Sequence, residues 1–214
     1  MAASDGPKIN TNGLILCLDA ADRNSYPGSG ETWYDLSGNN YHATIFGFVA
    51  HNDRVFTLPG TSGNYIQQLS LNLSTTNHTI IGASRYVTVG GRVFSGGANN
   101  WLMGHWASST VKYYAGGWVT DSVTNEQSDT RWRIYAATGN YTSDLWSFYV
   151  NGVVDTPENS SGVNGPNGFN IGRYLDGTEY SNSQVGFLLA YNRILSASEI
   201  LQNYNVMKTR FGLL

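Results

Sequence analysis

Short strand-like runs follow one another along almost the whole chain, and each is ended by Gly, Asn or Pro. The expected strands span residues 13–19, 41–49, 54–58, 65–69, 79–89, 92–94, 101–106, 111–115, 117–123, 130–138, 145–150, 153–155, 169–172 and 185–191. Asn151-Gly152 joins two alternating runs and is a preferred pair for a two-residue hairpin. Many short strands at this spacing predict an all-β fold built as a two-sheet antiparallel sandwich.

The end of the chain departs from this pattern, because the last strand leads directly into a helix. Ser196 and Glu199 have the spacing of a capping box, in which each side chain satisfies the other's backbone N–H. After them, apolar residues recur at three- and four-residue steps and form one helical face: Ile200, Leu201, Tyr204 and Met207. The sequence therefore predicts one short C-terminal helix over 196–209 that docks on the sandwich by this face.

Five segments, in order along the chain, resemble those of LamG-like (concanavalin A-like) jelly-roll domains. They are residues 13–20, 33–47, 144–152, 169–172 and 184–199. The last of them, a strand followed by YNRxLSxxE and a helix, is most similar to the versions found in bacteriophage virion proteins. The resemblance implies a single jelly-roll domain over 1–214, with an N-terminal arm over 1–12. It does not by itself imply an activity, because this fold serves lectins, hydrolases and virion parts.

The composition disfavours several partners. Charged residues make up 13% of the 214 residues and the net charge is −3, so there is no basic footprint for nucleic acid. No stretch is long enough to span a membrane, and the first residues lack a signal-peptide core. Cys17 is the single cysteine and lies in an apolar run, where a buried hydrophobe is expected. These features favour synthesis in a host cytoplasm, with neither nucleic-acid binding nor membrane insertion.

Catalytic motifs are not expected in this chain. Glycan hydrolysis needs a pair of carboxyl groups, which relatives with that activity place on one strand at alternate positions. The chain has five Glu, and none has an Asp or Glu two residues away. The four His lie in no Ser/His/Asp order and no G-x-S-x-G occurs. The sequence favours a protein that is not an enzyme, with no catalytic residues.

Three aspartates are the candidate ligands for calcium. Many members of the resembled family bind Ca²⁺ through Asp carboxylates and loop carbonyls, the hard oxygens that this cation prefers. Asp19, Asp22 and Asp35 flank the first long loop. The alternative is that Asp22 and Asp35 cap turns through Asx hydrogen bonds. The resembled family also has an acidic residue near the position of Gly186, which this chain lacks.

An aromatic cluster between residues 99 and 118 is the candidate carbohydrate site. Aromatic rings stack on the C–H faces of sugars while amides hydrogen-bond to hydroxyls. The residues expected to be exposed and to bind sugar are Asn99, Asn100, His105, Tyr114 and Trp118. The alternative is that the rings fill the space between two sheets, as most strand aromatics do.

Together these features predict a non-enzymatic bacteriophage virion structural protein, either a capsid decoration or a tail or fibre component. Its lectin-like sandwich would be displayed on the virion and would contact glycan on the host surface. Its expected partners are copies of itself and capsid or tail proteins, with a trimer preferred because capsid and fibre positions often have threefold symmetry. The alternatives are a free carbohydrate-binding lectin and a polysaccharide hydrolase.

Overall fold

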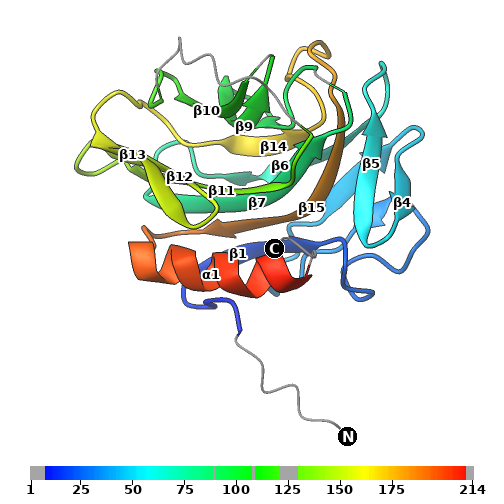
Figure 1. Cartoon of the computed structure of the whole chain (residues 1–214), viewed down its shortest axis with the longest axis horizontal. Helices are drawn as coiled ribbons and strands as arrows, with labels where there is room; N and C mark the ends of the chain where they lie inside the picture. The colour runs from blue at the N-terminus through cyan, green and yellow to red at the C-terminus, as the bar shows by residue number, and fades with distance from the viewer. Residues whose placement is uncertain (1–7, 89, 108, 121–129, 211–214) are drawn as a thin grey trace, which may run out of the picture.

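The chain folds as two antiparallel β-sheets packed face to face, with one helix outside them (Figure 1). This is a computed structural model, and it describes residues 8–88, 90–107, 109–120 and 130–210. The predicted jelly-roll sandwich with one short C-terminal helix is confirmed. None of the described residues forms a helix long and apolar enough to cross a membrane.

The larger sheet has eight strands. Its members are β1 (Leu14–Asp19), β4 (Ala50–Asn52), β5 (Val55–Pro59), β7 (His78–Tyr86), β11 (Arg133–Asn140), β12 (Leu145–Val150), β13 (Val153–Asn159) and β15 (Asn182–Tyr191). Strand β15 is central: its first half pairs with β5, its second half with β1, and its other edge with β7. The register shifts at Gly186, between these two halves. The predicted hairpin at Asn151-Gly152 is present, and both residues have positive φ, 52° and 78°.

The smaller sheet has seven strands. Its members are β2 (Thr32–Trp33), β3 (Ala43–Phe46), β6 (Tyr65–Asn72), β8 (Phe94–Gly96), β9 (Trp101–Trp106), β10 (Ser109–Ala115) and β14 (Asn167–Ile171). They lie in the order β10-β9-β8-β14-β6-β3-β2. The short strands β2 and β4 were not expected from the sequence. The expected strand over 117–123 is wrong for residues 117–120, where only Trp118 forms a bridge; residues 121–123 lie outside the described part of the chain.

Large rings fill the space between the two sheets. The largest of these fully buried side chains are Trp33, Trp101, Trp146, Tyr86, Tyr113, Tyr135, Phe56, Phe94, Phe148 and Phe169. They come from alternate positions of both sheets, which is why the strands read as alternating runs in the sequence. Burial of this many aromatic side chains supplies the main apolar stabilisation of the sandwich.

Helix α1 (Ala197–Arg210) covers the outer face of the eight-stranded sheet, below β1 and β15 in Figure 1. The predicted capping box is confirmed: the Ser196 N–H donates to Glu199 Oε2 at 2.8 Å, and the Glu199 N–H to Ser196 Oγ at 3.3 Å. Ile200 and Met207 are buried, and Tyr204 packs against the same cluster. Leu201 was expected to dock as well, but it is 43% exposed.

The N-terminal arm, as far as it is described, lies along this helix. Asn203 is fully buried, and its side chain accepts from the Asn10 N–H at 2.8 Å and donates to the Tyr191 hydroxyl at 3.0 Å. Arg193 donates to both carboxylate oxygens of Glu199, at 2.6 and 3.0 Å, and to the Asn10 side chain. The arm, the helix and the end of β15 therefore form one hydrogen-bonded unit.

Candidate functional site

The outer face of the seven-stranded sheet carries a row of rings and guanidinium groups that the helix does not cover. This face is turned away from α1 in Figure 1. We call the row the aromatic–arginine strip. Its members are Phe46, Tyr65, Arg92, Trp106, Tyr114, Trp118, Arg173 and Tyr174.

One end of the strip is a cluster of three rings at the edge of the sheet. The ring centroids of Trp106 and Trp118 lie 5.3 Å apart, and those of Tyr114 and Trp118 lie 5.1 Å apart. All three side chains are half-buried. The geometry comes from a tight turn after β10: Gly116 has φ +77°, and the Ala115 N–H donates to the Gly117 carbonyl at 2.8 Å. This turn folds Trp118 back onto Tyr114, with which it forms a β-bridge.

The centre of the strip is built around the buried side chain of Arg92. The Arg92 guanidinium forms an ion pair with Glu179 at 2.7 Å and donates to Asn100 Oδ1 at 2.6 Å. It also lies 4.0 Å from the centroid of the Tyr174 ring. Trp106 Nε1 donates to the same Glu179 oxygen at 2.6 Å. Glu179 therefore fixes both the guanidinium and the indole, so that these groups are positioned in advance of any ligand.

The other end of the strip crosses β6 and β3. The Arg173 guanidinium carbon lies 3.5 Å from the centroid of the Tyr65 ring. Tyr65 in turn stacks on Phe46, with centroids 4.5 Å apart and planes at 17°. Beside them, Gln67 donates to the buried Asn170 side chain at 2.9 Å. This end therefore combines flat apolar surface with an amide at its border.

These groups have the chemistry that sugar recognition requires. Half-exposed rings offer flat faces to the C–H groups of a pyranose, and the neighbouring amides, guanidinium groups and carboxylate can pair with hydroxyls. Aromatic and Arg side chains are also the residues that carry most binding energy in protein recognition surfaces. Fixed rings lose little conformational entropy when a ligand binds.

Of the five residues expected to bind sugar, the structure brings three to the strip. Tyr114 and Trp118 belong to it, and exposed Asn100 adjoins it through Arg92. Asn99 has another role: its amide donates to Asn164 and Gly165, and it accepts from the Asn167 N–H at 2.9 Å. Asn99 therefore joins two loops.

The expectation that His105 is exposed is wrong. His105 is fully buried between the sheets, and its Nδ1 lies 2.9 Å from Ser84 Oγ and 3.3 Å from the Tyr135 hydroxyl. Trp101, Met103 and His105 do share one strand face, as the alternation indicated, but it is the inner face. The next residue, Trp106, is the one that reaches the strip.

The expected calcium site does not form. The described part of the chain contains no group of three or more His, Cys, Asp or Glu side chains placed to hold a metal ion. Asp35 is buried and accepts four hydrogen bonds, from the Cys17, Ser37 and Tyr41 N–H groups and the Ser37 hydroxyl. Asp22 and Asp35 accept from backbone N–H groups two residues ahead, the Asx geometry that was the alternative, and Asp19 does the same.

Sequence reasoning missed most of the strip, because its members come from distant segments. Phe46, Tyr65, Arg173 and Tyr174 lie on strands and loops that only the sheet order brings together. One local signal was present: Tyr65, Gln67 and Leu69 alternate with apolar or buried residues, which places them on one sheet face. The sequence could not show that α1 covers the other sheet and not this one.

No protein-family model matches the chain, and no curated protein matches it in sequence. Several solved structures do share its fold. A Trypanosoma rangeli sialidase in complex with 2,3-difluorosialic acid has a TM-score of 0.64 and 14% identity over 98% of this chain and 36% of its own. The binding domain of Paraclostridial Mosquitocidal Protein 1 has a TM-score of 0.65 and 15% identity, over 92% of this chain and 53% of its own.

The receptor-binding domain of botulinum neurotoxin type G is also similar, with a TM-score of 0.59 and 15% identity over 92% of this chain. The chain spans 36% to 53% of the length of these structures. At such identities the similarity shows a shared fold and no more. The chain is an antiparallel β-sandwich of the fold that these structures share.

Proposed function

We propose that this chain is a non-enzymatic β-sandwich that binds glycan through the aromatic–arginine strip. The observation that carries the proposal is the arrangement of Trp106, Trp118 and Tyr114 as half-buried rings beside the Arg92–Glu179 pair. Rings of a structural core would be fully covered, whereas these keep part of their surface exposed, on the sheet that lies opposite α1. The T. rangeli sialidase and the toxin binding domains lend support as proteins of the same fold whose names describe sialic acid analogue or receptor binding.

The proposed role is binding without cleavage. Hydrolysis of a glycosidic bond by the usual mechanism needs two carboxyl groups, one on each side of the bond. Glu179 is the one acidic residue among those that build the described strip, and its carboxylate is held by Arg92 and by the Trp106 indole. The described strip therefore offers one carboxyl group and not the pair that hydrolysis requires.

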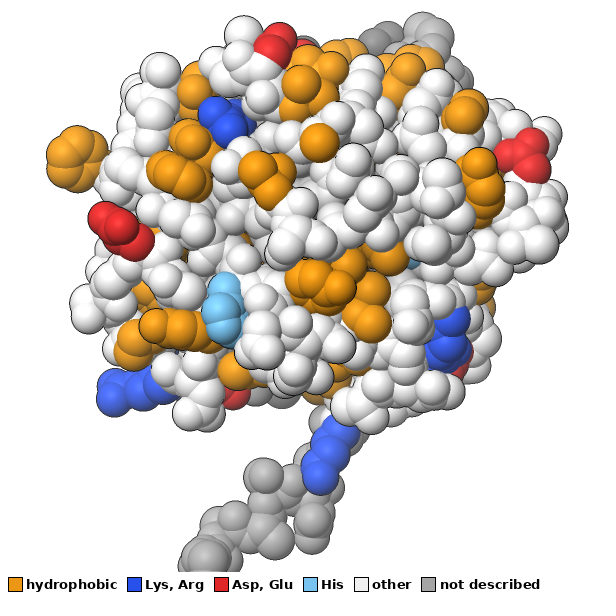
Figure 2. Space-filling model, turned by 180° about the vertical axis from the view of Figure 1, so that it is seen from behind, with side chains coloured by type: hydrophobic (Ala, Val, Ile, Leu, Met, Phe, Trp, Pro, Cys, Tyr) orange, Lys and Arg blue, Asp and Glu red, His pale blue; other side chains and the backbone are white. Residues whose placement is uncertain are grey.

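The proposed setting is a bacteriophage virion, where the sandwich decorates the capsid or forms part of a tail or fibre and contacts host-surface glycan. This part rests on the resemblance of the 184–199 segment to virion proteins. Figure 2 shows a surface with few charged side chains and scattered hydrophobic ones, which suits contacts with capsid or tail proteins. Homo-oligomers, with a trimer preferred, follow from the threefold symmetry of many virion positions. Light scattering of the purified chain tests this: a monomer that also fails to bind capsid would favour a free lectin.

Glycan binding is tested on an array of bacterial and host-type glycans. The intact chain should be retained on at least one class of glycan, and Tyr114→Ala should lose that retention because one wall of the ring cluster is gone. Tyr141→Ala is the matched control, since Tyr141 is 46% exposed in a turn of the other sheet. A silent array for the intact chain, or equal loss in both variants, would contradict the proposal. Release of reducing sugar from a retained glycan would support the hydrolase alternative.

A further inference from the structure

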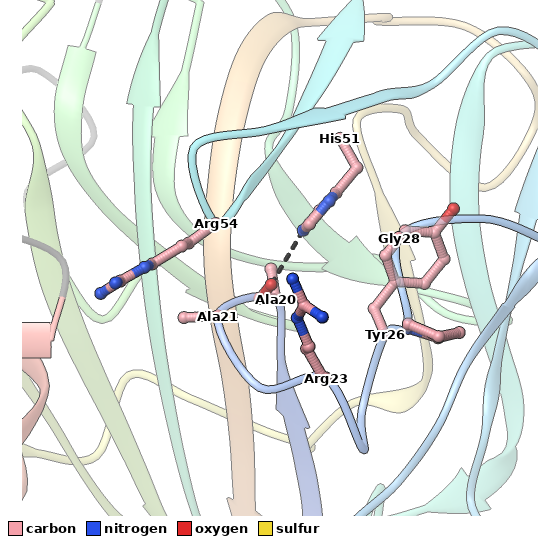
Figure 3. A pocket seen from close by; sticks show the side chains of 8 residues that line it. Ala20, Ala21, Arg23, Tyr26, Gly28, His51 and Arg54 are labelled. Atoms are coloured by element: carbon pink, nitrogen blue, oxygen red, sulfur yellow. Dashed lines mark hydrogen bonds between the residues drawn. The ribbon is translucent and has the colours of Figure 1, made fainter.

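A pocket outside the strip is formed by the loop after β1 and the β4–β5 hairpin. Its volume is about 640 Å³, and it is lined by Ala20, Ala21, Arg23, Tyr26, Pro27, Gly28, His51 and Arg54. In Figure 3, the Arg23 guanidinium points from below toward the His51 imidazole, whereas the Arg54 side chain extends to the other side of Ala20 with its guanidinium directed away from Arg23. This is the loop where the sequence suggested a cation site, yet none of the lining residues is acidic.

The two charged side chains that line this pocket, Arg23 and Arg54, have the same sign, and the nearest acids along the chain, Asp22 and Asp53, are not among its lining residues. Arg23 and Arg54 are exposed, and neither forms an ion pair with any described residue. In the strip, by contrast, Arg92 is held by a carboxylate and an amide, and Arg173 donates to the Asn170 amide oxygen. Two unpaired guanidinium groups at one pocket create a positive potential that an anion would relieve.

The pocket is held in shape before any ligand arrives. The Tyr26 N–H donates to the Asp22 carbonyl at 2.8 Å, which closes the turn that carries Arg23. His51 Nε2 donates to the Ala20 carbonyl at 2.8 Å, which joins the hairpin to the loop (Figure 3). The Tyr26 and His51 rings meet edge to face with centroids 4.8 Å apart. A pre-formed site loses little entropy on binding.

Arg54 occupies a backbone position that normally belongs to glycine. The β4–β5 turn is Asp53-Arg54, with φ values of 51° and 70°. Turns with two positive φ angles strongly prefer Asn-Gly or Asp-Gly, and this chain uses Asn151-Gly152 at the equivalent point of the β12–β13 hairpin. A long cationic side chain at such a position is strained, and strained residues cluster at ligand sites.

We propose that this pocket binds an oxyanion group, the carboxylate, sulfate or phosphate of a small polar molecule, through Arg23 and Arg54. Planar guanidinium groups match the geometry of these anions and can bond to two oxygens at once. The His51 ring, oriented by its bond to Ala20, forms one wall of the site. This inference does not depend on glycan binding by the strip, because the two sites share no residue.

The test is the anion-dependent rise in the unfolding midpoint, measured at constant ionic strength maintained with chloride. A ligand that binds the folded state raises the midpoint in a concentration-dependent way. The probes are inorganic sulfate, inorganic phosphate and glucuronate, with glucose as the neutral counterpart of glucuronate. The intact chain should respond to at least one anion and not to glucose, and the responding probe identifies the source of the oxyanion.

Arg54→Gly is the most informative variant, because it removes the cation and also removes the strain of a non-glycine residue at positive φ. Without anion its unfolding midpoint should equal or exceed that of the parent chain, and its apparent anion affinity should fall about tenfold, the effect of one hydrogen bond to a charged group. Arg23→Gln should weaken binding similarly. Lys8→Gln, which removes the same charge from the exposed N-terminal arm, should leave the response unchanged.

Three results would overturn the proposal. The first is a midpoint of the intact chain that responds to none of the three anions. The second is an equal loss of response in Lys8→Gln, which would indicate a net-charge effect. The third is a lower midpoint of Arg54→Gly in the absence of anion together with an unchanged anion affinity, which would make Arg54 a structural residue of the turn.

Discussion

The two outer faces of the sandwich differ in how far their apolar and aromatic side chains are covered. On the eight-stranded sheet, the side chains of Ile81, Ile134, Phe187 and Leu189 are covered by α1 and are at most 2% exposed. On the seven-stranded sheet, the rings of the strip and Arg173 keep part of their surface exposed, while Arg92 is buried among its partners. An apolar face that is covered stabilises the fold, and an aromatic face that is left open while its polar partners are fixed is suited to recognition.

The contacts that fix helix α1 explain why the outer face of the eight-stranded sheet stays covered. The helix is fixed at its first turn by the capping box and by the Arg193–Glu199 pair, and along its length by Asn203. Among the described residues, no helix or strand is fixed over the strip by polar contacts of this kind. Its rings are instead fixed from the side, by Glu179 and by Arg173. The two faces are therefore predicted to respond differently to substitution.

The largest effect is expected under the helix. Ile200 is 2% exposed and packs in the cluster between α1 and the sheet, so Ile200→Ala should lower the free energy of unfolding by about 2–5 kcal/mol. Leu201→Ala is the control on the same helix turn. Because Leu201 is 43% exposed, its loss should cost about 1 kcal/mol or less. Urea unfolding of both variants measures this, and equal costs would show that the helix is not the buried layer described.

A smaller effect is expected when the anchor of the helix is protonated. Hydrogen bonds from Arg193, and then from the Ser196 N–H, lower the pKa of Glu199 from its usual 4.5 to about 2. Since the folded-state pKa is depressed, the stabilisation is complete above about pH 4.5 and is lost as the pH falls toward 2. The pair is about one quarter exposed, so the effect is modest.

Glu199→Gln isolates this contribution. The variant should be less stable than the parent at neutral pH, and the difference between them should shrink as the pH falls from 4.5 toward 2. Denaturant unfolding at a series of pH values provides the measurement. A difference that does not change with pH over this range would mean that the pair does not anchor the helix.

The fold was largely predictable because its signals are local. Strand alternation, the Asn151-Gly152 turn and the Ser196–Glu199 capping box each depend on neighbours in the chain, and all are present as predicted. The two strands that were missed have only two or three residues, too few for a periodic pattern. Leu201 was misplaced because a helical face defined by spacing is wider than the stripe that meets the sheet.

The candidate site was predictable only in part, because strand parity and sheet order are tertiary properties. Strand alternation correctly placed His105 and Trp101 on the same face of their strand, but it could not show whether that face points toward the core. Tyr114 and Trp118 were found because they are close in sequence, whereas Arg173 and Tyr65 are joined only by the pairing of β14 with β6. The aspartates failed as calcium ligands because each has local backbone donors to accept from.

The most direct test of the contrast between the two faces measures glycan affinity and unfolding free energy on the same two variants. Trp118→Ala should weaken binding of a responsive glycan about tenfold or more while it changes the unfolding free energy by about 1 kcal/mol or less. Met207→Ala, at a buried helix position, should lower the unfolding free energy by about 2–5 kcal/mol and leave the affinity of the folded protein unchanged. Unchanged affinity in Trp118→Ala, or its unfolding together with the loss of binding, would contradict the account.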